Sequence, residues 1–307
     1  MDIIFSHGHC PDGFTAALIA CRRYPEAKVV FLDHGMTDDK IADITNYSWN
    51  NDVLMTDFSF RTREQNDRLA YVAKSFRILD HHKTAQATLE GAPYAVFDMN
   101  RSGAGLTWDY LYGKDRDKSE HITLGRVRWT CGTTFIRPWW VNYIEAQDLW
   151  KWGTLPEMEE VCAYLRTLPY DFDVWNNVFD NSSVGDAAKL GQGALALINK
   201  YVLEAVGQRQ TGLLNGYKVA VVNALYMMCS EVGAALSNLE GVDMGMSWFE
   251  RPDGFMQFSL RSIKGGPVDV SAIAKSFGGG GHASAAGFQL PYQEGRKILD
   301  AALGRGV

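Results

Sequence analysis

Histidine and aspartate residues recur in this sequence at positions where a short apolar run ends. One run is followed by the triplet Asp80-His81-His82, another by Asp57, and the first by His7, His9 and Asp12. Imidazole and carboxylate groups that converge suit a hard to borderline divalent ion such as Mn²⁺. Taken singly, each of these residues is also typical of a polar cap on a strand or a helix.

Five of the seven histidines lie in such polar segments: His7, His9, His81, His82 and His282. This concentration favours a functional site over scattered surface histidines. Two ions that share a bridging carboxylate can clamp a phosphoryl group and lower the pKa of a water, so that no protein nucleophile is needed. The residue types therefore predict phosphoester hydrolysis.

A second group of residues suits an anionic ligand. Four consecutive glycines at 278–281 precede His282, and they indicate either a flexible loop or a backbone that donates N–H groups to a phosphate. Arg261 ends an alternating run, where its guanidinium suits a phosphate; the alternative is a surface arginine on an edge strand. Ser102 opens an expected helix, and helix N-termini bind anions.

The apolar runs predict the strands of a parallel sheet that is buried on both faces. They cover residues 3–5, 29–32, 53–55, 76–79 and 94–97. The segments 13–23 and 62–74 are long enough for crossover helices. Ligands bind at the carboxyl edge of such open sheets, which is where the polar residues would gather. We therefore expect an α/β fold with its site at this edge.

The rest of the chain predicts more helices and a second, smaller α/β unit. Helices are expected at 102–112, from Pro138 through Glu145, Asp148 and Trp152, and at 156–167, with a loop at 114–128. The second unit is expected to hold strands at 217–222 and 285–290, a hairpin of 244–249 with 255–260, and helices at 230–238, 269–276 and 293–303. We expect domains at 1–183 and 211–307, joined by a linker helix at 184–210.

The composition is that of an ordinary globular protein, since 46% of the 307 residues are hydrophobic and 21% are charged. The net charge of −6 argues against a surface that tracks the phosphates of a long duplex. No apolar run reaches the ~18 residues of a membrane span, and we expect the first residues to form a strand rather than a signal peptide. Five cysteines without a Cys-x-x-Cys pair fit a reducing cytoplasm and do not predict a zinc site built from thiolates.

The order of the motifs resembles the DHH phosphoesterase family, which includes RecJ-type exonucleases, nano-RNases, cyclic-dinucleotide phosphodiesterases and a class of manganese pyrophosphatases. Ser6-His7 with Cys10-Pro11-Asp12-Gly13-Phe14 resembles its first motif, Asp57 its second and Asp80-His81-His82 its third. Residues 145–150 resemble its fourth, acidic motif, and residues 278–288 resemble the glycine-rich signature of the DHH-associated C-terminal domain. The resemblance spans residues 3–290.

The resemblance implies a role for each matching residue. His7 would bind a first metal ion and Asp12 a second, and Asp57 would bridge them. His81 and Asp148 would complete the second site. His82 would contact phosphoryl oxygens, and Asp80 would orient the histidine pair. Arg261, Gly279, Gly280, Gly281 and His282 would bind the substrate.

The first motif departs from the family pattern at one position. Much of the family carries Asp-x-Asp there, and the first of these positions holds Cys10 in this chain. Either His9 or Cys10 replaces the missing carboxylate, or the first metal site is weak. Cys10 is also compatible with a packing role alone.

Taken together, the motifs lead us to expect a cytoplasmic Mn²⁺-dependent phosphodiesterase with one or two ions, for which Mg²⁺ or Co²⁺ would substitute. It would hydrolyse short oligonucleotides, linear dinucleotides or related nucleotides with metal-activated water. The alternatives are a pyrophosphatase or phosphomonoesterase, such as one acting on 3′-phosphoadenosine nucleotides, and a non-catalytic nucleotide-binding module. We expect no membrane or long-duplex partner, and a homodimer is compatible with the sequence.

Overall fold

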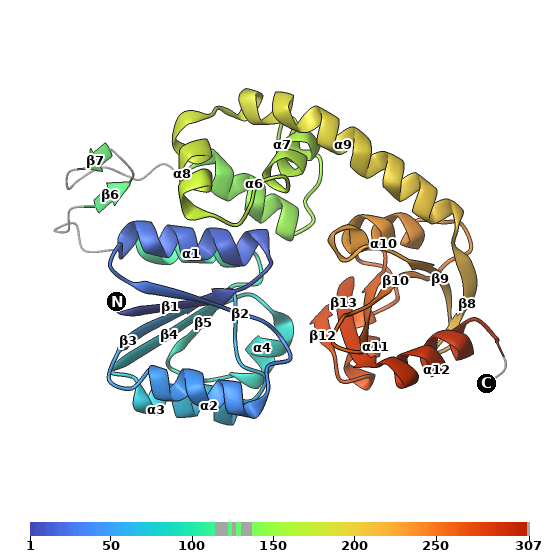
Figure 1. The fold of residues 1–307 in the computed structure, drawn as a ribbon, viewed down its shortest axis with the longest axis horizontal. Coiled ribbons are helices and arrows are strands. Elements are labelled where there is room, and N and C mark those ends of the chain that lie inside the picture. Colours follow the sequence, from blue (N-terminus) through green and yellow to red (C-terminus); the bar gives the residue numbers. More distant parts are fainter. Residues whose placement is uncertain (114–121, 125–126, 130–136, 306–307) are drawn as a thin grey trace. The chain divides into compact units, whose positions relative to one another are not determined.

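The computed structural model describes residues 1–113, 122–124, 127–129 and 137–305. The chain divides into two compact units, Met1–Leu195 and Ala196–Val307. Each unit combines helices with a sheet of its own (Figure 1). The expected α/β fold with a parallel N-terminal sheet and a second α/β unit is confirmed.

The sheet of the first unit has five parallel strands in the order β2-β1-β3-β4-β5. The strands are β1 (Ile3–His7), β2 (Lys28–Leu32), β3 (Asp52–Thr56), β4 (Ser75–Asp80) and β5 (Ala95–Phe97). In this order the chain leaves β1 toward one edge and returns to build the other edge from β3. The carboxyl ends of β1 and β3 therefore meet at the switch point where ligands bind in open α/β sheets.

Alternating side chains of these strands enter two different cores. Ile4, Leu54 and Leu79 pack with α1 (Pro11–Arg23) and α5 (Gly103–Tyr112), whereas Ile3, Val53 and Ile78 pack with α2 (Asp38–Tyr47) and α3 (Arg63–Val72). Figure 1 shows α1 on one face of the sheet and α2 and α3 on the other. Both faces are thus covered, as the continuous apolar runs require.

Further helices extend the core on the α1 side. They are α6 (Trp139–Asp148), α7 (Met158–Leu165) and α8 (Phe172–Asn181). The short helix α4 (Lys83–Thr88) follows β4. The helix expected through Trp152 ends at Asp148, because Trp150 adopts a φ of +55° that an α-helix does not allow. The prediction of a loop at 114–128 is wrong where the chain forms β6 (Ile122–Leu124) and β7 (Val127–Trp129), which pair antiparallel. The other residues of this predicted loop lie outside the described residues.

The second unit contains a mixed sheet in the order β12-β13-β11-β10-β9-β8, in which β9 and β10 pair parallel and the other neighbours antiparallel. Its strands are β8 (Gln210–Leu214), β9 (Tyr217–Asn223), β10 (Met244–Glu250), β11 (Phe255–Arg261), β12 (Gly280–His282) and β13 (Ala285–Pro291). Its helices are η1 (Tyr226–Met228), α10 (Cys229–Ser237), α11 (Val270–Ser276) and α12 (Tyr292–Ala302). The long helix α9 (Val184–Gly207) contains the boundary between the two units.

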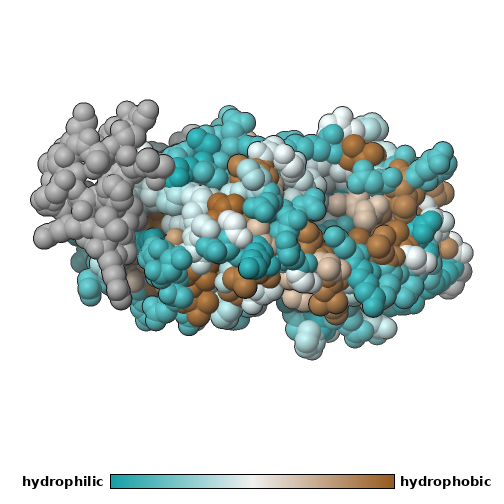
Figure 2. Space-filling model, turned by 90° about the horizontal axis from the view of Figure 1, so that it is seen from above, coloured by the Kyte–Doolittle hydropathy of each residue, from teal (hydrophilic) through white to brown (hydrophobic). Residues whose placement is uncertain are grey.

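The second unit also has a core on each face of its sheet. Val219 and Val221 pack with Leu299 of α12, whereas Ala220 and Val222 pack with Val232 of α10. Hydrophilic residues cover much of the face of the molecule in Figure 2, with hydrophobic residues scattered among them. Among the described residues, no helix combines the length and the apolar character that crossing a membrane requires.

Candidate metal centre

Three neighbouring strands deliver the polar residues to the carboxyl edge of the first sheet. His7 is the last residue of β1, Asp57 follows β3, and His81 follows β4. Asp57 has a φ of +53°, a left-handed conformation that aspartate tolerates better than most residues. The ends of β1 and β3 are tied together, since Thr56 Oγ1 donates to Ser6 Oγ at 2.9 Å.

Asp57 lies at the centre of the site, with a histidine on each side. His81 Nε2 lies 3.2 Å from Asp57 Oδ1. His7 Nδ1 lies 3.5 Å from Asp57 Oδ2. The two carboxylate oxygens thus face two different imidazoles, which is the arrangement of a carboxylate that bridges two ions.

The first group of ligands is carboxylate-rich and consists of Asp12, Asp57 and His81, whose ligand atoms all lie within 4.8 Å of one another. All three side chains are buried. Asp148 joins them from the end of α6, because its Oδ2 lies 3.5 Å from His81 Nε2. The sequence-predicted ligands Asp12, Asp57, His81 and Asp148 are therefore brought together.

The second group consists of His7, Cys10 and Asp57, again with ligand atoms within 4.8 Å of one another. The two groups share Asp57. His9 is not part of this group; it is exposed and has a left-handed φ of +52°. Of the two substitutes considered for the missing carboxylate, the structure thus brings Cys10 to the site.

The electrostatics of the site favour a cation. Burial alone would lower the pKa of His81, but Asp57, Asp148 and Asp12 outweigh burial and raise this pKa to about 11. Burial and the charges of Asp57 and Asp148 raise the pKa of Asp12 well above its ordinary value. The raised pKa reflects the repulsion between buried carboxylates when no cation lies among them, and divalent ions would offset this repulsion.

Two buried atoms of the site are poorly satisfied by their neighbours. Asp57 Oδ1 and His7 Nδ1 make no hydrogen bond of good geometry with the described residues. Buried polar atoms in this state are uncommon and point to a ligand. Because the donor set combines imidazole, carboxylate and thiol groups, it fits divalent metal ions.

Asp80 organises the rest of the triplet. Its Oδ1 accepts hydrogen bonds from His82 Nδ1 at 2.7 Å and from the backbone N–H of His81 at 2.7 Å. Its Oδ2 accepts from Ser59 Oγ at 2.5 Å. Burial would raise the pKa of Asp80, but His82 and Ser59 outweigh it and lower this pKa to about 2. Burial would lower the pKa of His82, but the charge of Asp80 outweighs burial and raises this pKa.

The N-terminus of α5 holds Asp12 in place. The backbone N–H groups of Gly103 and Ala104 donate to the two carboxylate oxygens of Asp12 at 2.6 and 2.9 Å. Ser102 caps the same helix, and its buried hydroxyl accepts from the N–H of Gly105. The Ser102 hydroxyl is thus engaged in the cap, and the anion at this helix end is Asp12 itself.

Glu145 of the acidic motif has a supporting position. It pairs with Arg101 at 3.3 Å and with Arg137 at 2.9 Å, and it accepts from the N–H of Ser102 at 3.3 Å. It therefore anchors the start of α5, which in turn holds Asp12. Within the acidic motif, Asp148 faces the histidine, and Glu145 faces the arginines.

His34 is a residue of the site that the sequence analysis did not select. Its ring lies 4.8 Å from the ring of His7 and stacks on Phe58 at 5.0 Å. It follows β2 and so reaches the same edge as the ligands. Its position directly after a predicted strand was the available signal.

Two of the predicted anion-binding residues of the second unit, Arg261 and His282, lie in one row of its sheet. Arg261 at the end of β11 and His282 at the end of β12 both pair with Ala285 of β13. This row puts their backbones about 10 Å apart. Arg261 donates to Ser230 Oγ at 2.8 Å and to the carbonyl of Leu260 at 2.9 Å, which are neutral acceptors.

The glycine run forms a strand rather than a flexible loop. Gly280 and Gly281 belong to β12, and Gly281 has a φ of +137°. A Cβ at Gly279 would lie 2.1 Å from the carbonyl oxygen of Gly287. Close packing against β13 thus requires Gly279, and the predicted contact of these glycines with a phosphate stays a prediction.

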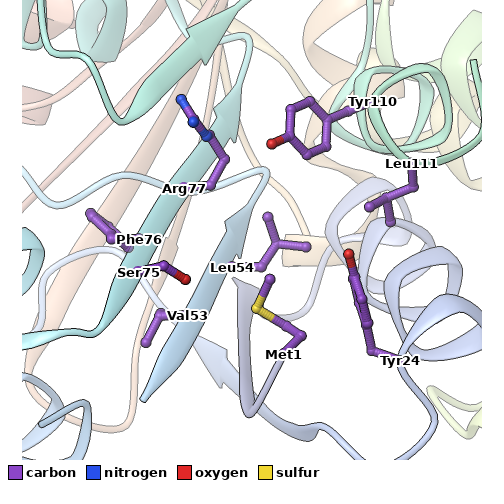
Figure 3. Close-up of a pocket in the computed structure, with 9 residues that line it drawn as sticks. All are labelled: Met1, Tyr24, Val53, Leu54, Ser75, Phe76, Arg77, Tyr110 and Leu111. Atoms are coloured by element: carbon purple, nitrogen blue, oxygen red, sulfur yellow. The ribbon is translucent and has the colours of Figure 1, made fainter. Parts of the chain in front are cut away.

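A pocket of the first unit lies at the opposite edge of the sheet from the ligands (Figure 3). It is lined by Met1, Tyr24, Val53, Leu54, Ser75, Phe76, Arg77, Tyr110 and Leu111. Most of these residues come from the amino-terminal parts of β3 and β4 and from the end of α5, whereas Met1 precedes β1 and Tyr24 follows α1. Its volume of about 180 Å³ is below that of most ligand sites, so we assign it no role.

Two comparisons relate this chain to known sequences. The DHHA1 domain model matches residues 216–304. An uncharacterized protein of Acanthamoeba polyphaga mimivirus is 27% identical over 311 residues, which cover 94% of this chain and 67% of that protein.

Among solved structures, the pGpG-specific phosphodiesterase PggH of Vibrio cholerae is 11% identical with a TM-score of 0.46, covering 99% of this chain and 98% of that chain. RecJ of Thermus thermophilus in complex with Mn²⁺ is 12% identical with a TM-score of 0.46, covering 99% of this chain and 52% of that chain. The DHHA1 match shows that residues 216–304 form a DHHA1 domain, as the resemblance of the glycine-rich segment predicted, and the motif order of the first unit resembles that of the DHH phosphoesterases.

Proposed function

We propose that this chain is a metal-dependent phosphodiesterase that acts on short oligonucleotides, linear dinucleotides or related nucleotides. The observation that carries the proposal is the sharing of Asp57 by two ligand groups, one with Asp12 and His81 and the other with His7 and Cys10. A shared carboxylate is the hallmark of a two-ion site for phosphoryl transfer. Mn²⁺ is the expected ion at the carboxylate-rich group.

The residues around the ligands complete the chemistry. Ions held here would lower the pKa of a water and offset the charge that develops on the phosphoryl group. His82 would donate to a phosphoryl oxygen, because Asp80 orients its ring through Nδ1 and favours its charged form. The described side chains at this edge thus supply both ligands and a charged donor.

The substrate class is supported by the second unit. The two terminal nitrogens of Arg261 donate to neutral acceptors, the carbonyl of Leu260 and the hydroxyl of Ser230. Its Nε makes no hydrogen bond of good geometry with the described residues. A guanidinium in this state suits a phosphate or a terminal nucleotide. The acidic net charge of −6 favours short substrates over long duplex.

A turnover assay on a substrate panel tests the proposal. Metal-free protein would be supplied with Mn²⁺ and given short RNA and DNA oligonucleotides, a linear dinucleotide, a 3′-phosphoadenosine nucleotide and pyrophosphate. We expect mononucleotide products from the oligonucleotides or the dinucleotide, and no turnover after chelation of the metal. Preferred hydrolysis of pyrophosphate or of the 3′-phosphate would contradict the phosphodiesterase proposal and support a pyrophosphatase or phosphomonoesterase. Tight binding without cleavage would support a nucleotide-binding module without catalysis.

A further inference from the structure

Cys10 occupies a position where a cysteine has no evident structural task. It is the N-cap residue of α1, a position that serine, threonine, aspartate and asparagine favour because their oxygens accept from the helix. Its side chain makes no capping hydrogen bond. It forms no disulfide, and it is half-buried rather than part of a core cluster.

The thiol instead faces two other ligand atoms. Cys10 Sγ, a ring nitrogen of His7 and a carboxylate oxygen of Asp57 lie within 4.8 Å of one another. Asp57 has a side chain that is only 2% exposed, and its Oδ2 lies 3.5 Å from His7 Nδ1. His7 Nδ1 is itself buried and makes no hydrogen bond of good geometry with the described residues. A buried carboxylate and a half-buried imidazole with an unsatisfied nitrogen, next to a thiol, indicate a site for a cation.

We propose that Cys10 is a thiolate ligand of the ion held by His7 and Asp57, so that the centre combines two different metal preferences. The thiol would lose its proton to solvent when the ion binds. A Cys-His-Asp set prefers Zn²⁺ or Co²⁺, whereas the neighbouring group of Asp12, Asp57 and His81 suits Mn²⁺ or Mg²⁺. The inference rests on the proposed function, since it concerns one half of the same centre.

The sequence left Cys10 as one of two replacements for the missing carboxylate and did not single it out, because its partners are not all neighbours in the chain. Thiolate zinc sites are usually found from Cys-x-x-Cys spacing, and this chain has none. Here the partners of the thiol are an imidazole from the end of β1 and a carboxylate that follows β3. Only the pairing of β1 with β3 brings them together.

Titration of the metal-free full-length protein with Co²⁺ tests the inference. The absorption spectrum would report a thiolate-to-cobalt charge-transfer band, and elemental analysis would count the bound ions. The variants are Cys10→Ser and Cys10→Asp, and Cys21→Ser on the adjoining helix α1 is the matched control. We expect the band in the wild type and in Cys21→Ser, and its loss in both Cys10 variants.

Metal competition adds a second measurement. Cys10→Asp restores a carboxylate, so we expect it to bind as many ions as the wild type while its preference shifts at least about tenfold from Zn²⁺ toward Mn²⁺. In the wild type, Zn²⁺ should protect Cys10 from alkylation, as read by peptide mass spectrometry, while Cys21 reacts equally with and without the ion. This measurement needs no variant.

The outcomes separate this inference from the proposed function. Co²⁺ binding without the band, a band that persists in Cys10→Ser, or alkylation of Cys10 that Zn²⁺ does not slow would overturn the thiolate ligand and leave the metal-dependent function standing. Failure of the wild type to bind any Co²⁺, Zn²⁺ or Mn²⁺ would overturn both.

Discussion

At the scale of residues, Asp57 is the central carboxylate of the candidate metal centre. Asp57 is buried, adopts a left-handed backbone conformation and contacts His7 and His81 through different oxygens. Burial would raise its pKa, but the two histidines lower this pKa well below its ordinary value. The ionised form is therefore favoured, as a bridging ligand requires.

Asp57→Asn should remove the bridge and with it most of the bound metal. The amide has the same shape, so the fold should survive, but it binds cations far more weakly than a carboxylate. We expect turnover to fall about 100-fold or more, and the number of bound ions to fall with it. Asp43→Asn on the exposed face of α2 is the control and should match the wild type in both measurements. Unchanged metal content in Asp57→Asn would show that Asp57 is not a ligand.

Asp80 should make the stability of the protein sensitive to acid. Its pKa is lowered to about 2, from an ordinary value of 3.8. A lowered carboxyl pKa contributes stability that is present above the ordinary value and is lost as the pH falls toward the lowered one. The contribution is roughly 2 kcal/mol, and most of it should disappear between about pH 4 and pH 2.

Urea unfolding at several pH values would measure this effect. Between about pH 5 and pH 2, the free energy of unfolding of Asp80→Asn should fall by roughly 2 kcal/mol less than that of the wild type. Asp43→Asn should follow the wild type over the same range. Parallel curves for Asp80→Asn and the wild type would mean that Asp80 does not hold the lowered pKa.

Single residues also show the limits of prediction from sequence. His7, Asp12, Asp57, His81 and Asp148 were selected because they follow apolar runs or match a family motif, and the structure brings all of them together. Cys10 and His9 could not be separated by sequence, since the choice depends on the left-handed φ of His9. His34 was missed because its contact with His7 arises from the pairing of β1 with β2.

At the scale of elements, the start of α5 acts as a platform for the site. Its free N–H groups bind both oxygens of Asp12, and its cap residue is tied to Glu145. The helix end thus contributes partial positive charge next to a group of carboxylates. Gly103 is the point of closest approach, because a Cβ there would lie 2.4 Å from Asp57 Cβ.

Gly103→Ala should therefore weaken the metal site without unfolding the protein. The added methyl group has to displace Asp57 or shift the helix start, and either movement disturbs both ligand groups. We expect metal affinity to fall about 10- to 100-fold, as for the loss of an outer contact to a ligand. Gly193→Ala in α9 is the matched control, since a Cβ there meets nothing within 4 Å, and it should keep wild-type affinity. Equal affinity in both variants would show that α5 does not position the site.

The sequence analysis missed β8 and α8, among other elements, and it missed these two for different reasons. β8 is an edge strand with mostly exposed residues, so burial leaves little trace in its sequence. α8 contains aromatic, β-branched and asparagine residues, which are poor helix formers, and tertiary packing of Trp175 and Phe179 compensates for them. The central strands β1, β3 and β4 were predicted because they are buried on both faces.

At the scale of the whole molecule, separate cores divide the chain. The first half of α9 packs through Ala187 and Ala188 into the core of the first unit, and its second half packs through Ala205 into a core of the second unit. The candidate metal ligands His7, Asp12, Asp57, His81 and Asp148 all lie in the first unit. The two units should therefore respond to different perturbations.

Calorimetry should resolve this difference as two unfolding transitions. Mn²⁺ at about 100 times its dissociation constant should stabilise the first unit by roughly 2.7 kcal/mol and leave the other transition unchanged. Phe258→Ala should lower only the second transition, by about 3–5 kcal/mol, because the Phe258 ring is fully buried against Phe288. Leu54→Ala should lower only the metal-sensitive transition. A single transition that responds to the ion and to both variants would mean that α9 couples the two cores into one cooperative unit.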